Sequence, residues 1–413
     1  MLATRVSMEK TYSYIDLFAG CGGLSLGLHN AGWDGIFAIE KAEDAFKTLE
    51  HNLIEKHKHF SWVDWLPQKH LDIESVIRKY KNELKSLRGT VDMVTGGPPC
   101  QGFSVAGRRH ESDGRNTLIK SYIRFIKLVE PKILFFENVR GFTLEFKKNR
   151  EKGRIYSEYV LRELTKAGYH VFGQLVNFGD FGIPQNRTRF ILVGLHKNLA
   201  HANIQMAKRF FSLLTENRTD FLKRLSLPQR PVLNDAIEDL LKENGVFRLA
   251  ESMKFLMGKY SFPKGAYQRF MRRNMKANVP DSHRFANHTE TIEARLRYLL
   301  ENAEKNKDLS HELREKFGIK KHTLVPLGID SPSRTLTSNP DDLIHYSEPR
   351  FLTVREYARI QSFPDDFEFK GKYTTGGLRR RIDVPRYTQI GNAVPPLFAE
   401  QSGLTLKQLL DGC

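Results

Sequence analysis

Short apolar runs alternate with helix-like segments through the first half of the chain. Apolar runs that stop at glycine, proline or polar residues predict buried strands, and apolar residues spaced three and four apart predict amphipathic helices. Strands are expected near residues 14–18, 35–40, 91–95, 133–136, 169–176 and 190–195, and helices near 24–30, 42–53, 118–129 and 159–164. Strands separated by helices predict an α/β fold whose parallel sheet is covered on both faces.

This alternation stops after Leu195, and the chain is polar, basic and irregular up to about residue 330. Residues 196–330 hold 25 lysines and arginines against 16 acidic residues. Within them, residues 252–280 carry seven basic residues, no acid and five interleaved aromatic residues. Such a mixture can follow phosphates and stack on bases. A solvated face above core aromatics is the alternative interpretation of the same pattern.

The composition restricts the class of protein. The 413 residues include 65 Lys and Arg against 48 Asp and Glu, a formal charge of +17, which favours a polyanionic partner. No apolar run approaches the ~20 residues of a membrane-spanning helix, and the N-terminus lacks a signal core, so a cytoplasmic protein is expected. Three cysteines, Cys21, Cys100 and Cys413, argue against a disulfide scaffold and a cysteine-rich zinc site, and we expect no metal.

A glycine-rich segment directly follows the first expected strand. Residues 18–23 read Phe-Ala-Gly-Cys-Gly-Gly and lead into a helix. Glycines allow a tight turn there, and a helix N-terminus offers free N–H groups to a ligand. Glu40 ends the next strand, 20 residues after Gly20, where an acid can bind ribose hydroxyls. The arrangement favours an adenosine-containing cofactor, while its G-x-G-G spacing argues against a dinucleotide.

A second candidate segment, Gly-Gly-Pro-Pro-Cys-Gln at 96–101, follows the expected strand 91–95. Open α/β sheets place their sites at the carboxyl ends of strands. Two prolines restrict the backbone before Cys100 and so direct its sulfur. Cysteine is intrinsically nucleophilic even when only a few per cent is thiolate. The segment therefore predicts a nucleophile, against the alternative of a buried cysteine that acts as a small hydrophobic residue.

Three further polar segments are candidates for chemistry. Glu137 follows another strand, where burial would raise its pKa and let it donate a proton; the alternative is a helix cap or a surface acid. Arg187 and Arg189 alternate, as two side chains on one face of a strand would, and suit oxyanions; an exposed, charged edge strand is the alternative. Gly-Asn-Ala-Val-Pro-Pro at 391–396 is a site segment or a plain turn.

Taken together and in this order, these blocks resemble the DNA (cytosine-5) methyltransferases, of the bacterial restriction–modification type. The resemblance spans residues 14 to about 400. It rests on D-L-F-A-G-x-G-G at 16–23, G-G-P-P-C-Q at 96–101, E-N-V at 137–139, Q-N-R-T-R at 185–189, R-E-Y-A-R-I-Q-S-F-P at 355–364 and G-N-A-V-P-P at 391–396. It implies a Rossmann-like S-adenosylmethionine-dependent methyltransferase sheet with a smaller, inserted target-recognition domain.

The resemblance also implies the residues that bind S-adenosyl-L-methionine. Glu40 would bind the ribose, Asp72 the adenine amino group and Ile73 the adenine ring. The remaining residues of the pocket would be Phe18, Gly20, Gly23, Pro98, Leu118 and Asn392. Family members often carry an aromatic residue after the ribose-binding acid, but here that position is Lys41.

The same resemblance implies the catalytic roles. Cys100 would add to C6 of the target cytosine, and Glu137 would protonate N3. Arg189 would hold O2, and Arg187 would support the thiolate. The base would have to leave the duplex, because a stacked cytosine cannot be reached. The loop 101–117 would close over the DNA.

The expected organisation is discontinuous. Residues 12–195, completed by 386–413, would form the catalytic domain, and 196–385 the target-recognition domain and return segment. The implied partner is double-stranded DNA, bound by a monomer; a cognate restriction endonuclease acting on the same site fits this type, without direct contact. One alternative is a tRNA cytosine-5 methyltransferase on the same scaffold. The absence of cysteine from residues 196–354 argues against it. The other alternative is a DNA-binding protein that has lost catalysis.

Overall fold

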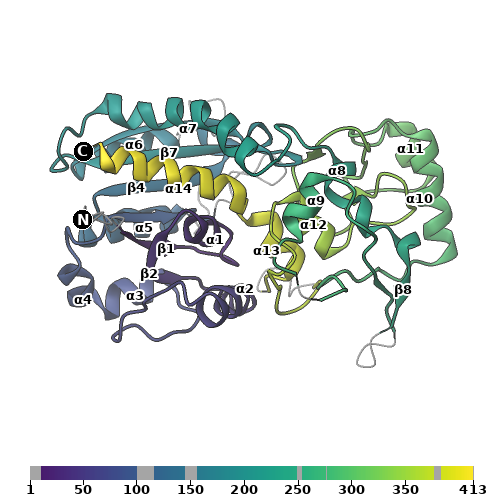
Figure 1. Cartoon of the computed structure of the whole chain (residues 1–413), viewed down its shortest axis with the longest axis horizontal. Coiled ribbons are helices and arrows are strands. Elements are labelled where there is room, and N and C mark those ends of the chain that lie inside the picture. Colours follow the sequence, from purple (N-terminus) through teal and green to yellow (C-terminus); the bar gives the residue numbers. More distant parts are fainter. Residues whose placement is uncertain are drawn as a thin grey trace, which may run out of the picture.

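A six-stranded sheet in the order β2-β1-β3-β4-β7-β5 forms the centre of one lobe (Figure 1). The computed structural model describes residues 11–99, 116–144, 156–248, 254–275, 277–375 and 383–412. The strands are β1 Tyr12–Leu17, β2 Trp33–Ile39, β3 Met93–Gly96, β4 Ile133–Val139, β5 Tyr169–Asn177 and β7 Thr188–His196. A central sheet with helices between its strands confirms the predicted α/β fold class.

The expectation of an entirely parallel sheet was wrong for β7. Strands β1 to β4 pair in parallel, but β7 runs antiparallel to both β4 and β5. Between β5 and β7 the chain has only the 3₁₀ turn η3 Phe178–Phe181 and the two-residue strand β6 Gln185–Asn186. A parallel neighbour needs a crossover of a dozen or more residues, usually a helix, so this short connection returns the chain antiparallel.

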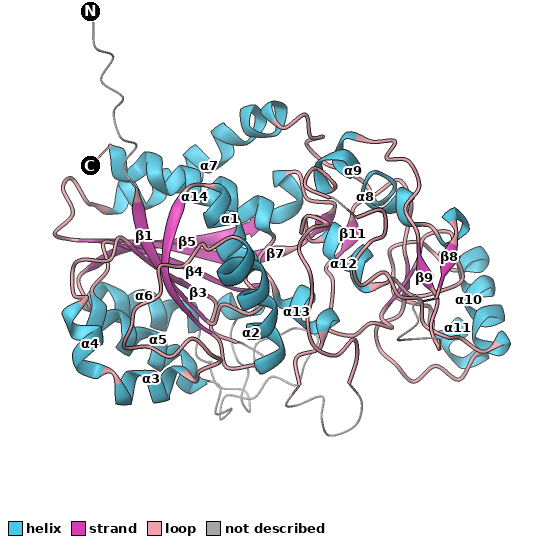
Figure 2. Ribbon diagram, turned by 60° about the horizontal axis from the view of Figure 1, so that its bottom comes forward, coloured by secondary structure: helices cyan, strands magenta, loops and turns pink. Residues whose placement is uncertain are grey.

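Helices cover both faces of the sheet (Figure 2). On α5, residues Ile119, Tyr122, Ile126 and Val129 follow helical spacing and are all fully buried, so this stripe attaches the helix to the sheet. Helices α1 Gly23–Asn30, α7 Ile204–Arg224 and α14 Pro396–Asp411 lie on one face. On the other lie α3 Ile73–Lys79, α4 Lys81–Ser86, α5 Asn116–Val129 and α6 Tyr156–Lys166.

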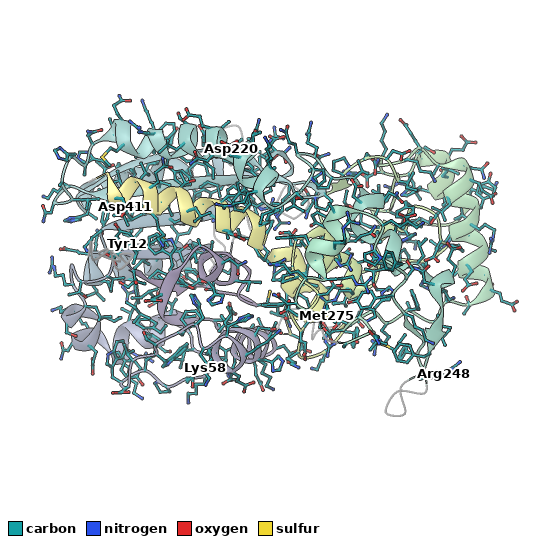
Figure 3. All side chains as sticks on the ribbon, in the orientation of Figure 1. Tyr12, Lys58, Asp220, Arg248, Met275 and Asp411 are labelled. Atoms are coloured by element: carbon teal, nitrogen blue, oxygen red, sulfur yellow. The ribbon has the colours of Figure 1, made fainter. Side chains whose placement is uncertain are left out.

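The end of the chain returns to its first strand. Tyr12 donates a hydrogen bond to Asp411 at 2.6 Å, and Figure 3 shows these two residues side by side. Helix α14 packs tightly on α1, because a Cβ at Gly27 would lie 2.3 Å from Ala399 Cβ. Only glycine allows such a close approach. Because α1 begins at the glycine-rich turn, this packing places α14 close to that turn.

Short helices and two-residue strands form the second lobe. They are α8 Leu233–Ile237, η4 Glu238–Leu240, η5 Lys242–Asn244, β8 Val246–Phe247, β9 Met257–Gly258, α9 Ala266–Met271, α10 Glu290–Asn302, α11 His311–Lys316, β10 Val325–Pro326, β11 Ser333–Arg334, β12 Leu343–Ile344 and α12 Val354–Ile360. Fully buried Arg359 pairs with Asp239 at 3.0 Å and Asp365 at 2.5 Å. Buried charges persist only when they are paired, so these residues hold α12 to η4.

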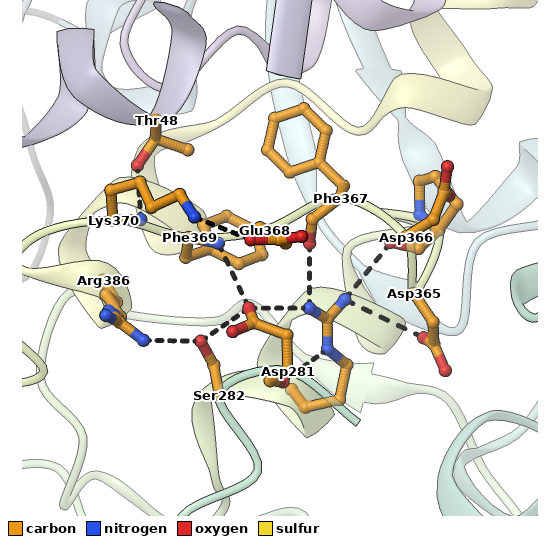
Figure 4. Close-up of polar contacts among 12 residues, drawn as sticks. Thr48, Asp281, Ser282, Asp365, Asp366, Phe367, Glu368, Phe369, Lys370 and Arg386 are labelled. Atoms are coloured by element: carbon orange, nitrogen blue, oxygen red, sulfur yellow. Dashed lines mark hydrogen bonds and ion pairs between the residues drawn. The ribbon is translucent and has the colours of Figure 1, made fainter. Parts of the chain in front are cut away.

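The two lobes are joined by backbone-to-side-chain hydrogen bonds. Around α2 Glu43–Leu49 and the π-helix η1 Glu50–Lys56, Thr48 accepts from the Lys370 N–H at 2.9 Å, and Asn52 exchanges bonds of 2.8 and 2.9 Å with the Glu368 backbone. Figure 4 shows Thr48 and Lys370 near Asp281, which pairs with Arg355 at 3.1 Å. Helix α7 follows residue 195 in the sequence, but it packs on β5, β7 and α14. The boundary expected at residue 195, between a catalytic and a target-recognition domain, therefore stays a prediction.

Candidate active site

The turn after β1 is strained at the position expected to meet the cofactor. Phe18 has φ +59°, Gly20 has φ +58° and Gly22 has φ +91°. A positive φ is costly for a bulky residue such as phenylalanine, and strain of this kind clusters at ligand sites. A Cβ placed on Gly20 would meet no atom within 4 Å, so the turn borders open space. That space and the half-buried turn fit an adenosine-containing ligand.

Glu40 is held against this turn by the backbone. Its carboxylate accepts from the Gly20 N–H at 2.9 Å and from the Ala42 N–H at 2.6 Å. Burial raises the pKa of Glu40, while these N–H groups lower it in part. The two bonds fix the direction of an acceptor at the end of β2, as ribose hydroxyls require.

Asp72 lies next to Glu40, because the Leu71 N–H donates to the Glu40 carbonyl at 2.7 Å. Asp72 caps α3 by accepting from the Ser75 N–H at 3.1 Å. Lys41, which is 79% exposed, places its Nζ 3.8 Å from Asp72 Oδ1. The position where the resemblance led us to expect an aromatic ring therefore holds a cation facing the acid expected at the adenine amino group.

The other residues predicted to bind the cofactor differ in how deeply they are buried. Ile73 is buried in the core that includes α3 and α5, and Leu118 is half-buried beside it. Pro98 is buried after β3, and Asn392 is exposed at the end of helix α13 Arg386–Asn392. Their contacts with a cofactor stay predictions.

Gly23 has a packing role. A Cβ there would lie 2.5 Å from the Val394 carbonyl and 2.9 Å from Phe363 Cζ. Gly23 thus brings the glycine-rich turn against the Gly-Asn-Ala-Val-Pro-Pro segment, which the sequence places more than 360 residues later.

The Gly23→Ala substitution is expected to lower the free energy of unfolding by about 1–3 kcal/mol, because a backbone carbonyl cannot yield to the added methyl group. Urea denaturation measures this change. Gly265→Ala is the matched control, since its φ is −95° and its Cβ would meet nothing closer than 4.0 Å. We expect that control to change stability by less than about 0.5 kcal/mol. Equal stability of the two variants would contradict the packing role.

Glu137 and Arg189 face each other where β4 pairs with β7. Arg189 Nε lies 3.1 Å from Glu137 Oε1, and both side chains are about nine-tenths buried. Burial raises the pKa of Glu137, and the guanidinium groups of Arg189 and Arg187 oppose that shift. A carboxyl group whose pKa is raised in a buried site is suited to donate a proton.

Arg187 is buried with few partners. It is 1% exposed, it donates to the Leu336 carbonyl at 3.4 Å, and its Nε has no hydrogen-bond partner among the described residues. It lies between β6 and β7, not within a strand as its alternation with Arg189 predicted. A buried guanidinium with an unused donor is costly, and an incoming anion would satisfy it.

The residues around Cys100 partly define its setting, although Cys100 itself lies outside the described residues. A Cβ on Gly97 would lie 3.0 Å from Glu137 Oε2, and Asn138 donates to the Pro98 carbonyl at 3.3 Å. The Gly-Gly-Pro-Pro segment thus runs beside the Glu-Asn-Val segment. Burial raises the pKa of Cys21 to about 12, which leaves that thiol unreactive.

Two glutamines connect blocks that sequence reasoning treated separately. Gln185 accepts from the Leu336 N–H at 3.0 Å and donates to Gln361. Gln361 in turn donates to the Ala393 carbonyl at 2.5 Å. Both are fully buried, so they hold the arginine segment, helix α12 and the segment after α13 in one arrangement. In the sequence, the signal that could have pointed to this role was that both glutamines lie within blocks that resemble the family.

A family model and individual relatives both identify this chain as similar to DNA methyltransferases. The family described as C-5 cytosine-specific DNA methylase matches residues 12–408. Type II methyltransferase M.DdeI of Desulfomicrobium norvegicum is 30% identical over 396 residues, covering 94% of this chain and 86% of that protein. Type II methyltransferase M.Sau96I of Staphylococcus aureus is 29% identical, covering 99% and 78%.

Solved structures share the fold. A putative DNA modification methyltransferase encoded within a prophage of E. coli superposes with a TM-score of 0.62 at 24% identity, covering 97% of this chain and 99% of that one. The Dnmt2 methyltransferase of S. pombe superposes with a TM-score of 0.51 at 15% identity, covering 98% and 99%. No helix in the described part of the chain is long and apolar enough to cross a membrane. With the family match extending over nearly its whole length, the chain belongs to the C-5 cytosine-specific DNA methylases and is a DNA cytosine-5 methyltransferase.

Proposed function

We propose that the protein methylates C5 of one cytosine within a short recognition sequence of double-stranded DNA, through a covalent bond between Cys100 and C6 of a flipped-out base. The observation that carries the proposal is the buried Glu137–Arg189 pair beside the segment that contains Gly97 and Pro98. It combines a proton donor with a fixed cation next to the segment that leads into Cys100. The methyl donor is S-adenosyl-L-methionine, whose sulfonium supplies an activated methyl group.

The chain's residues divide the reaction between them. The Cys100 thiolate adds to C6 while Glu137 transfers its proton to N3, so the negative charge does not accumulate on the ring. Arg189 binds O2 of the cytosine, and Arg187 stabilises the thiolate before attack. C5, now nucleophilic, takes the methyl group. A base then removes the C5 proton, the Cys100–C6 bond breaks, and N3 returns its proton to Glu137.

Cofactor placement follows from the turn after β1. Glu40 accepts hydrogen bonds from the ribose hydroxyls, and Gly20 leaves room for the ligand at the strained turn. Asp72 binds the adenine amino group, with Ile73 against the ring. Phe18, Pro98, Leu118 and Asn392 complete the pocket. Lys41 lies 3.8 Å from Asp72 and offers no ring for stacking, so we propose weaker adenine stacking than an aromatic residue would provide.

The proposed biological role is protection of host DNA in a restriction–modification system. The names of the relatives as type II methyltransferases support this role over a tRNA substrate. A cognate endonuclease would act on the same sequence without contacting this chain, and the enzyme would act as a monomer in the bacterial cytoplasm, bound to the nucleoid DNA.

The proposal is tested by mapping and trapping. The chain is expressed in a host without cytosine methylation, and 5-methylcytosine is mapped to find the recognition sequence. A duplex with 5-fluorocytosine at the mapped position is then incubated with enzyme and S-adenosyl-L-methionine. Fluorine cannot leave as a proton, so the Cys100–C6 bond is expected to persist on a denaturing gel. Methylation without trapping would refute the covalent step, and trapping on tRNA alone would favour the alternative substrate.

A further inference from the structure

Four side chains of the second lobe form a stack of alternating rings and guanidinium groups. The Arg284 guanidinium carbon lies 4.2 Å from the Phe255 ring centre and 3.5 Å from the Tyr373 ring centre. The Arg386 guanidinium carbon lies 4.2 Å from the same Tyr373 ring. All four side chains are half-buried. The stack draws on the chain beside β9, the loop 371–375 and the start of α13.

The stack holds positive charge that the described residues do not neutralise. Among them, none accepts a hydrogen bond from the Arg284 guanidinium or pairs with it as a carboxylate. Arg386 donates to the Gly371 carbonyl at 3.0 Å and to Ser282 Oγ at 2.8 Å, as Figure 4 shows for Ser282. The nearby acids are engaged, since Asp281 pairs with Arg355 at 3.1 Å and Asp383 with Lys372 at 2.7 Å.

This geometry suits an anion better than it suits structural packing. The rings of Phe255 and Tyr373, 4.2 and 3.5 Å from the Arg284 guanidinium carbon, restrict its orientation, and its N–H donors are left for solvent or a ligand. Two like charges on one ring repel each other, and an anion placed at their edges would relieve that repulsion. A guanidinium that is already fixed in orientation loses little entropy on binding, and it can engage a phosphate with two parallel hydrogen bonds.

The stack lies near the proposed chemistry. Arg386 begins α13, and Asn392, expected in the cofactor pocket, ends it. Six residues of helix span about 9 Å. Successive base pairs are about 3.4 Å apart, so that distance corresponds to roughly three steps along a duplex.

We propose that Arg284, supported by Arg386 and held by Phe255 and Tyr373, binds a backbone phosphate of the DNA a few nucleotides from the target cytosine. Arg284 is then a substrate-positioning residue that sets how the duplex lies across the two lobes. This inference rests on the proposed DNA substrate and names one contact for it. A phosphate contact positions the duplex but does not read its sequence.

Affinity as a function of salt tests this contact. Anisotropy of a labelled 30-base-pair duplex, with the mapped sequence or a scrambled one, is measured for the full chain between 50 and 300 mM salt. The Arg284→Gln variant is expected to bind both duplexes several-fold more weakly, with the slope of log K against log salt smaller by about 1. KM for DNA should rise while kcat and cofactor affinity stay near those of the unsubstituted enzyme.

Three further variants make the test specific. Arg162→Gln removes an equal charge from an arginine near Tyr159 on α6 and should keep the full slope. Tyr373→Leu removes a supporting ring without changing charge and should weaken binding, while Tyr373→Phe should not. Arg284→Lys keeps the charge and should retain most of the slope if Arg284→Gln misfolds.

The possible results distinguish a phosphate contact from a base contact and from the absence of DNA binding. A full slope in Arg284→Gln overturns the proposal. A full slope with lost preference for the mapped sequence would instead assign Arg284 to a guanine edge, which also overturns the phosphate contact. If the unsubstituted protein binds no duplex, the proposed DNA substrate fails, and the inference fails with it.

Discussion

Replacement of Cys100 by serine is expected to abolish methyl transfer, with a loss of more than about 10⁴-fold in kcat, the scale on which loss of a covalent nucleophile acts. A serine hydroxyl is far less ionised and less nucleophilic than a thiol, so addition to C6 becomes the limiting step. The 5-fluorocytosine duplex should also fail to trap this variant. Transfer of a labelled methyl group to the mapped duplex measures the first effect, and a denaturing gel measures the second.

Cys21→Ala is the matched control for this experiment. Cys21 is buried, its thiol pKa is raised to about 12, and its Sγ lies 3.7 Å from the Gln389 carbonyl. Its replacement should leave trapping and methyl transfer within a few-fold of the original. DNA and cofactor affinities of Cys100→Ser should be unchanged, which excludes unfolding as the cause. Retained methylation in Cys100→Ser would assign the nucleophile elsewhere.

Replacement of Glu137 by glutamine is expected to reduce kcat by about 10²–10⁴-fold, the range for removal of a general acid. The amide keeps the shape and can donate a hydrogen bond to N3, but it cannot transfer a proton. The amide oxygen can still accept from Arg189, but the guanidinium loses the negative charge of its partner at 3.1 Å, so cytosine O2 would be held less firmly. Single-turnover methylation measures the chemical step apart from product release.

The pH dependence of the reaction has a defined sign. Burial raises the pKa of Glu137 above its ordinary value, and Arg189 and Arg187 reduce that increase without reversing it. Only the protonated form donates to N3, so the rate should fall as pH rises through this raised pKa. The Glu137→Gln variant should lack that decline. Glu130→Gln, which removes the partner of Arg88, is the control and should keep the decline. A decline that persists in Glu137→Gln would assign it to another group.

Much of the site was predictable from local sequence. Glycine and proline punctuation after apolar runs placed Gly20 and Gly97 at the ends of strands, and parallel strands bring such ends to one edge of the sheet. Glu137 was expected just after its strand, but it lies within β4, which continues to Val139. The ordered blocks then identified the family, and the match over residues 12–408 agrees with that prediction. The alternation of Arg187 and Arg189 suggested one strand face, but the strand begins only at Thr188.

By itself, the amino-acid sequence determined the fold class through its periodicity. It determined the family and the candidate chemistry through short blocks whose order along the chain resembles that of a known family. Only the tertiary structure decided the antiparallel direction of β7, the packing of Gly23 on Val394, the glutamine links between distant blocks and the Arg284 stack. Each of these depends on contacts between segments far apart in the sequence. Such contacts are selected by the packing of the whole chain, and a local pattern can mark the residues without showing which distant segment they meet.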